Sequence, residues 1–219
     1  MTPALRKTSG TAPTLRDESA LLGRWVVWVA VGESLGFLAP ALAWLSATLL
    51  NPAATVPALV AAGAAEGALL GWAQARVLKR RIPALSAPRW IGGTALAASL
   101  AWLIGELAGE NPSVWQAWPV GAQIGVGVPA GALLLCSVGF AQWLELRRHL
   151  PRSGWWVAGS AAAWCLGLAV FLGVASPLWQ PGQPLPLVIM IGVLAAILMA
   201  VSMALATGLV LVRLLRRAA

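Results

Sequence analysis

The sequence predicts an all-α integral membrane protein with six transmembrane helices. Its 219 residues are 59% hydrophobic and only 10% charged, too few polar side chains to cover a water-soluble domain of this size. The apolar residues fall into six long segments. When the chain is threaded through a membrane by these segments, all fifteen Lys and Arg residues lie on one side.

Each predicted span has basic residues at one end only. In chain order the spans are 25–50, 56–78, 90–108, 120–146, 155–174 and 186–212. About 20 residues of helix cross a ~30 Å hydrocarbon layer, so each segment is long enough. The first, third and fifth spans follow Arg or Lys, whereas the second, fourth and sixth precede them. Pro40 and Pro129 fall inside the first and fourth spans, where the missing N–H predicts a kink.

The charge pattern predicts the orientation. Basic residues occupy the N-terminal tail, the connections after the second and fourth spans, and the C-terminus, whereas the connections around Asn51, Asn111 and Gln180 contain none. By the positive-inside rule, both termini and the two basic loops are cytoplasmic. We expect a disordered cytoplasmic tail over 1–22 and a transmembrane domain over 23–219.

The net charge of +8 is explained by the same pattern. Bases beside spans are attracted to anionic lipid headgroups, each contributing about 1 kcal/mol near the surface. We therefore expect membrane lipid as a partner and no binding of nucleic acid.

An internal repeat is visible as three parallel tandem helical hairpins of about 65 residues, all in one orientation. Their first helices align on Trp25, Trp90 and Trp156. Their second helices carry Gly71, Gly139 or Gly208 eight residues before a basic pair, although the third copy lacks the glutamine of the other two. The repeats cover 24–88, 89–153 and 154–219. A six-helix bundle with pseudo-threefold symmetry follows, and either the first or the second helices can line its centre.

One hairpin junction carries a longer pattern. It reads Gly139-Phe140-Ala141-Gln142-Trp143-Leu144-Glu145-Leu146-Arg147-Arg148, followed by Gly154-Trp155-Trp156. This stretch resembles a recurring pattern in uncharacterised bacterial multi-pass membrane proteins, and the junction from Gly71 to Trp90 is a weaker copy. The resemblance implies this architecture, in the bacterial cytoplasmic (inner) membrane, and no particular chemistry.

Small residues at four-residue spacing predict close helix packing, because they let two backbones approach. The glycines expected in this role are Gly63, Gly67, Gly71, Gly121, Gly125 and Gly139.

Two carboxylates at membrane depth are the strongest candidates for function, since a charge in hydrocarbon is costly. Glu33 lies about 12 Å into the layer beyond Trp25, and Glu66 about 15 Å from Arg76, at 1.5 Å per residue. Both belong to the first hairpin. They fit a proton or cation site, or a pair of protonated acids bonded to neighbouring helices or facing a partner subunit.

Other polar and aromatic residues have simpler expected roles. Gln74 and Gln142 are expected to bond across helices and set their register, with a ligand site as the alternative. Glu145 is expected to pair with nearby arginines. Most tryptophans are expected in interfacial belts. Those belts comprise Trp25, Trp90, Trp155 and Trp156 on the inner side and Trp115, Trp118 and Trp179 on the outer side.

Motifs for catalysis or metal binding are missing from the sequence. Its single histidine, His149, lies in a basic run, so no histidine is placed inside a span to bind a metal or activate a nucleophile. Cys136 and Cys165 lie inside predicted spans and are expected to pack as apolar residues. We expect no enzyme activity and no metal site, and no cofactor is indicated.

Three functions fit this sequence. The favoured one is a non-catalytic accessory or structural subunit that packs against partner membrane proteins or itself. The second is a small transporter or channel that uses Glu33 and Glu66. The third is a binder of an apolar pigment, quinone or lipid.

Overall fold

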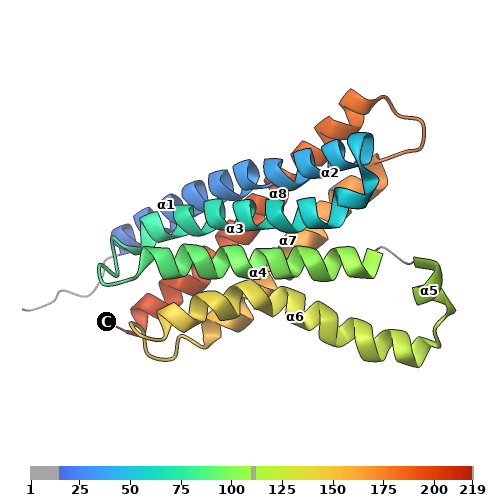
Figure 1. Ribbon diagram of the computed structural model, residues 1–219. Coiled ribbons are helices and arrows are strands. Elements are labelled where there is room, and N and C mark those ends of the chain that lie inside the picture. Colours follow the sequence, from blue (N-terminus) through green and yellow to red (C-terminus); the bar gives the residue numbers. More distant parts are fainter. Residues whose placement is uncertain (1–14, 110–111, 219) are drawn as a thin grey trace, which may run out of the picture.

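The computed structural model describes residues 15–109 and 112–218, and over these ranges it is helical with no strands (Figure 1). The elements are α1 (Leu15–Gly36), α2 (Leu38–Leu50), a 3-10 turn (Pro52–Ala54), α3 (Thr55–Leu78), α4 (Ala87–Gly109), α5 (Pro112–Ala117), α6 (Val120–Leu146), α7 (Trp155–Leu178) and α8 (Leu185–Arg216). Of the predicted tail over 1–22, residues 1–14 lie outside the described residues. The rest belongs to α1, which begins at Leu15.

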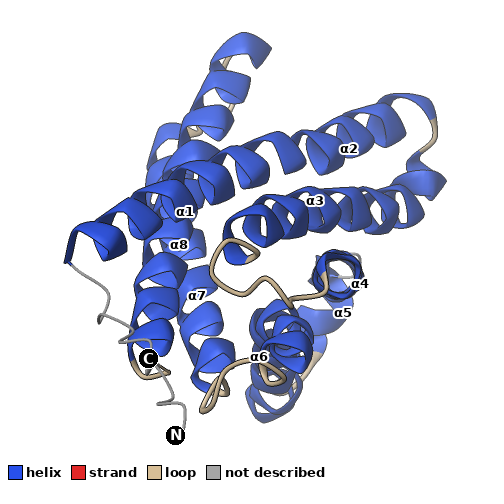
Figure 2. Ribbon diagram, turned by 90° about the vertical axis from the view of Figure 1, so that its left-hand side faces the viewer, coloured by secondary structure: helices blue, strands red, loops and turns tan. Residues whose placement is uncertain are grey.

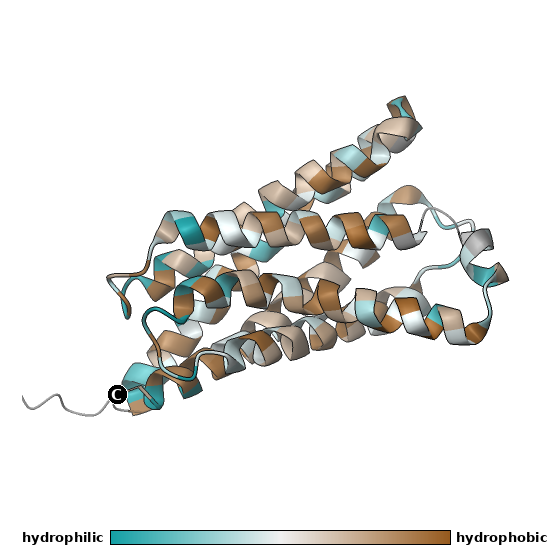
Figure 3. Ribbon diagram, turned by 60° about the horizontal axis from the view of Figure 1, so that its bottom comes forward, coloured by the Kyte–Doolittle hydropathy of each residue, from teal (hydrophilic) through white to brown (hydrophobic). Residues whose placement is uncertain are grey.

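Six of the helical segments are long and apolar enough to cross a membrane, as the sequence predicts. The first of them, Leu15–Ala47, combines α1 with most of α2. The two helices meet at Phe37, three residues before Pro40, whose ring cannot donate to the carbonyl of Gly36. Hydropathy follows this arrangement, with polar residues gathered at the helix ends and connections (Figure 3).

The six long helices form a closed ring. Going round it, α1 packs on α3, α3 on α4, α4 on α6, α6 on α7, α7 on α8, and α8 on α1 again. Figure 2 shows the same order of helices from a second direction. Neighbours in the ring are therefore neighbours in the chain, except where α8 meets α1. Neither the first helices of the predicted hairpins nor the second ones form a separate inner layer.

All described Lys and Arg residues lie at one end of the bundle, which we call the basic end. It includes the α3–α4 and α6–α7 connections and the C-terminal end of α8, at the left of Figure 1. Ion pairing helps to close the ring there, because Arg216 of α8 binds Glu18 of α1.

Packing is uneven along the bundle axis. The buried core gathers towards the basic end, and α6 buries no residue before Ser137. Pro129 lies within α6, which bends away from its neighbours towards the far end (Figure 1). The far half of α6 therefore presents apolar side chains that no other part of the described chain covers.

Candidate functional site

The two carboxylates predicted at depth lie on facing surfaces of α1 and α3. Glu33 is 4% exposed and Glu66 is 6% exposed. Gly36, nearly one turn from Glu33 on α1, touches the backbone of Glu66 so closely that a Cβ there would lie 3.1 Å from its carbonyl oxygen. The structure thus brings both carboxyl groups to one helix interface.

Their hydrogen bonding is unequal. The indole Nε1 of Trp102 on α4 donates to Glu66 Oε2 at 2.6 Å. Glu33 Oε2 is buried and has no hydrogen-bond partner among the described residues. An unpaired carboxyl oxygen away from water is costly, which makes Glu33 the unusual member of the pair.

Gly63 allows Trp102 to reach Glu66. A Cβ at Gly63 would lie only 2.3 Å from Trp102 Cδ1, so the indole ring lies directly across the bare backbone of α3. Gly63 precedes Glu66 by three residues and shares its helix face. Sequence reasoning missed Trp102, because no local pattern connects it to a carboxylate 36 residues earlier.

A second buried polar cluster lies at the centre of the bundle, nearer the basic end. Gln142 Nε2 donates to Gln74 Oε1 at 2.7 Å and to Thr94 Oγ1 at 3.0 Å. Trp90 Nε1 donates to Gln74 Oε1 at 3.1 Å, and Trp156 Nε1 donates to Gln142 Oε1 at 3.0 Å. The two glutamines therefore join four helices, α3, α4, α6 and α7.

A third tryptophan makes a similar bond. Trp25 Nε1 on α1 donates to Thr207 Oγ1 on α8 at 3.0 Å. The ring of Trp156 packs between the other two, with centroids 6.0 Å from Trp25 and 6.0 Å from Trp90. Thus each of the three donates its indole N–H to the helix that precedes it around the ring, which is α8 for Trp25, α3 for Trp90 and α6 for Trp156. Thr207 lies four residues before Leu211, the residue that the predicted repeat aligns with Gln74.

These three tryptophans correct one expectation from the sequence. Trp25, Trp90 and Trp156 are not in an interfacial belt, since their exposed fractions are 0%, 0% and 1%. Their indole N–H groups point to buried acceptors instead of to water. Trp155, by contrast, is 63% exposed and lies where an interfacial residue is expected.

The glycines divide into packed and unpacked groups. Gly67 and Gly71 lie against α4, where added Cβ atoms would come within 2.7 Å of Thr94 O and 3.1 Å of Ile91 Cα. Gly139 lies equally close to α7, with Ser160 Cβ at 2.8 Å. Two glycines depart from the expectation. Gly121 and Gly125 are on the exposed far half of α6, with no neighbouring atom within 4 Å of an added Cβ.

Glu145 makes more contacts than the predicted arginine pair. Its Oε1 accepts from the backbone N–H of Ser86 at 2.8 Å and lies 3.0 Å from His149 Nε2. Arg148 and Arg89 lie 3.9 Å and 3.8 Å from its other oxygen. Buried Glu145 therefore fastens the α3–α4 connection to the end of α6.

Among the described residues, no group of three or more His, Cys, Asp or Glu side chains is placed to hold a metal ion. No known protein family, curated protein or solved structure matches this chain.

Proposed function

We propose that this protein is a non-catalytic membrane subunit that assembles with partner membrane proteins or with a second copy of itself. In this proposal the three hairpins are parallel repeats in a bacterial cytoplasmic membrane, and the basic end faces the cytoplasm. The observation that carries the assembly role is the far half of α6. It combines a Gly121-x3-Gly125 pair, around which the described chain leaves open space, with the lack of any buried residue before Ser137.

Exposed leucine or valine alone would not argue for a partner, because lipid tails are equally apolar. Glycine differs, since it lowers helix stability by about 0.8–1 kcal/mol relative to alanine. Two glycines one turn apart make a shallow groove that a second helix fills better than flexible acyl chains. The same spacing on α3 packs against α4 within this chain.

The centre of the bundle supports a structural role over a permanent pore. Trp25, Trp90 and Trp156 fill it near the basic end, and their N–H groups are bonded to side chains of the ring. A conduction path through the centre would have to displace these rings.

Native mass spectrometry after mild extraction tests the assembly role. We expect the chain within a larger complex, and we expect Gly121→Leu/Gly125→Leu to release it. Gly173→Leu on α7 is the matched control, because Gly173 is also exposed with nothing within 4 Å of an added Cβ. A wild-type chain that is extracted alone contradicts the proposal.

Cysteine labelling tests the orientation. In a chain with Cys136 and Cys165 replaced by alanine, we expect Arg80→Cys to react with an impermeant reagent only from the cytoplasmic side. Gln180→Cys should react only from the opposite side. Labelling of both positions from one side contradicts the threading.

Transport is the second candidate, and it is favoured by the unpaired Glu33 Oε2 beside Glu66. Two buried carboxyl groups without a bonded base can exchange a proton or bind a cation. The test is flux in proteoliposomes. Loss of proton or cation flux in Glu66→Gln, with the complex intact in both Glu33→Gln and Glu66→Gln, would support transport. Absence of flux in liposomes that contain the wild-type protein would exclude transport.

A further inference from the structure

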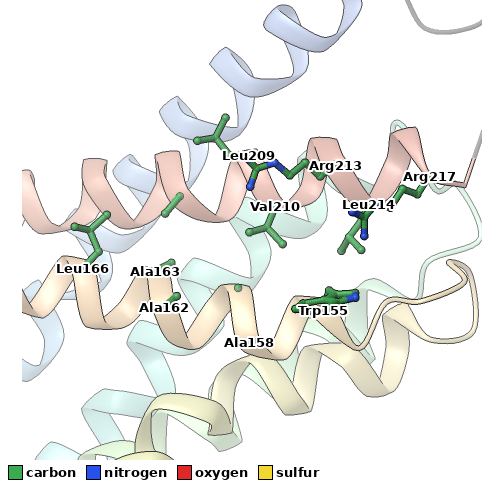
Figure 4. Close-up of a pocket in the computed structure, with 12 residues that line it drawn as sticks. Trp155, Ala158, Ala162, Ala163, Leu166, Leu209, Val210, Arg213, Leu214 and Arg217 are labelled. Atoms are coloured by element: carbon green, nitrogen blue, oxygen red, sulfur yellow. The ribbon is translucent and has the colours of Figure 1, made fainter.

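A groove on the outer surface runs between α7 and α8 at the basic end (Figure 4). Its volume is about 580 Å³. The α7 wall is made of small residues, including Ala158, Gly159 and Ala162, and the α8 wall includes Leu209 and Val210. The two helices touch at its floor, where a Cβ on Gly159 would lie 2.6 Å from Val210 Cγ2.

The mouth of the groove is positively charged. Arg213 of α8 and Arg217, directly after the end of α8, line it together with the exposed ring of Trp155 (Figure 4). Trp155 also borders an adjoining open hollow with Arg152. Both arginine side chains are exposed. Two guanidinium groups can thus meet an anion at the height of the lipid headgroups.

The groove is one leaflet deep. Its α7 wall runs from Trp155 to Leu166, about 16 Å at 1.5 Å per residue. This length is close to half of the ~30 Å hydrocarbon layer. The lining residues end at Leu166 on α7 and at Ala206 on α8. A transmembrane helix from a partner would need a seam through both leaflets, whereas an acyl chain needs only one.

We propose that this groove binds an anionic phospholipid from the leaflet at the basic end. Arg213 and Arg217 bind the phosphate, for which a guanidinium offers paired donors. One acyl chain lies against Ala158 and Ala162, and the ring of Trp155 covers the glycerol region. This binding site is separate from the far half of α6 and does not depend on the subunit role.

Lipid titration of the delipidated full chain, followed by native mass spectrometry, tests the proposal. We expect one phosphatidylglycerol to bind much more tightly than phosphatidylcholine of the same chain length. Arg213→Gln/Arg217→Gln should weaken phosphatidylglycerol binding about thirtyfold, from about 1 kcal/mol per base and tenfold per 1.4 kcal/mol.

Two further variants distinguish specific lipid binding in the groove from general attraction of anionic lipid to the positive charge of the basic end. Lys79→Gln/Arg80→Gln removes the same charge at the basic end, outside the groove, and should change binding less than threefold. Ala158→Leu/Ala162→Leu fills the groove at exposed positions, keeps all arginines, and should abolish the tight binding. Equal losses in the two charge pairs, equal binding of the two lipids, or tight binding after the groove is filled would each overturn the proposal.

Discussion

Replacement of Gln142 by leucine removes three hydrogen bonds from the centre of the bundle. The lost bonds are the donations to Gln74 at 2.7 Å and Thr94 at 3.0 Å, and the acceptance from Trp156 at 3.0 Å. Side-chain bonds between helices in membranes average about 0.6 kcal/mol, which gives about 2 kcal/mol for three. The indole N–H of Trp156 also loses its acceptor, and an unsatisfied buried donor costs about 1–3 kcal/mol.

We therefore expect the free energy of unfolding of Gln142→Leu to fall by about 3–5 kcal/mol. Unfolding by SDS in mixed micelles measures it, with fluorescence of the buried tryptophans as the signal. Gln123→Leu is the matched control, because Gln123 lies on the same helix and makes one bond, to Trp118 O at 2.9 Å, near the exposed far end. Equal stability of the two variants would refute the reasoning.

Three further predictions concern single contacts. Thr207→Val keeps the side-chain shape but removes the acceptor of Trp25, so a bond of about 0.6 kcal/mol is lost and a buried indole N–H is left unsatisfied at a cost of about 1–3 kcal/mol. The SDS midpoint should fall by the sum of the two, and an unchanged midpoint would mean that the bond contributes nothing. Gly67→Val should destabilise by about 1–3 kcal/mol through overpacking, whereas Gly105→Val, with open space around it, should not. Glu145→Ala should speed hydrogen exchange of the Ser86 amide, which donates to Glu145 at 2.8 Å; unchanged exchange would contradict the anchoring role.

The six spans could be predicted because length and apolarity are properties of consecutive residues. A helix needs a run of about 20 apolar residues to cross the membrane, and such a run can be read directly from the sequence. The start of α1 at Leu15 was missed, since Asp17 and Glu18 do not look like part of a span. Acidic residues favour the first turn of a helix, so the helix extends beyond its apolar part.

The environment of the tryptophans could not be predicted from depth alone. Trp155 and Trp156 are at almost the same depth, yet one is 63% exposed and the other 1%. They differ by one residue, or about 100° around the helix. The side of α7 that faces the bundle centre is set by how the six helices pack. The small residues that flank Trp155 and Trp156 do not form one apolar face that would identify this side.

The sequence predicts that the two carboxyl groups lie at comparable depth, but it does not predict the hydrogen bond from Trp102 to Glu66. Glu33 and Glu66 could be placed at similar depth by counting residues from Trp25 and from Arg76. The bond from Trp102 to Glu66 depends on the close approach of α3 and α4 at Gly63. Likewise, Thr207 takes the place of a glutamine from a position four residues away, which an alignment without gaps cannot show.

The bond between Trp25 and Thr207 has a consequence for how the protein is made. The two residues are 182 positions apart, so the ribosome releases Trp25 with the first hairpin and its acceptor only with α8. Until then the indole N–H of Trp25 lacks its acceptor in a medium where an unsatisfied polar group costs several kcal/mol. A nascent chain that stops before α8 is left with an unclosed ring, in which the indole N–H of Trp25 has not yet met Thr207.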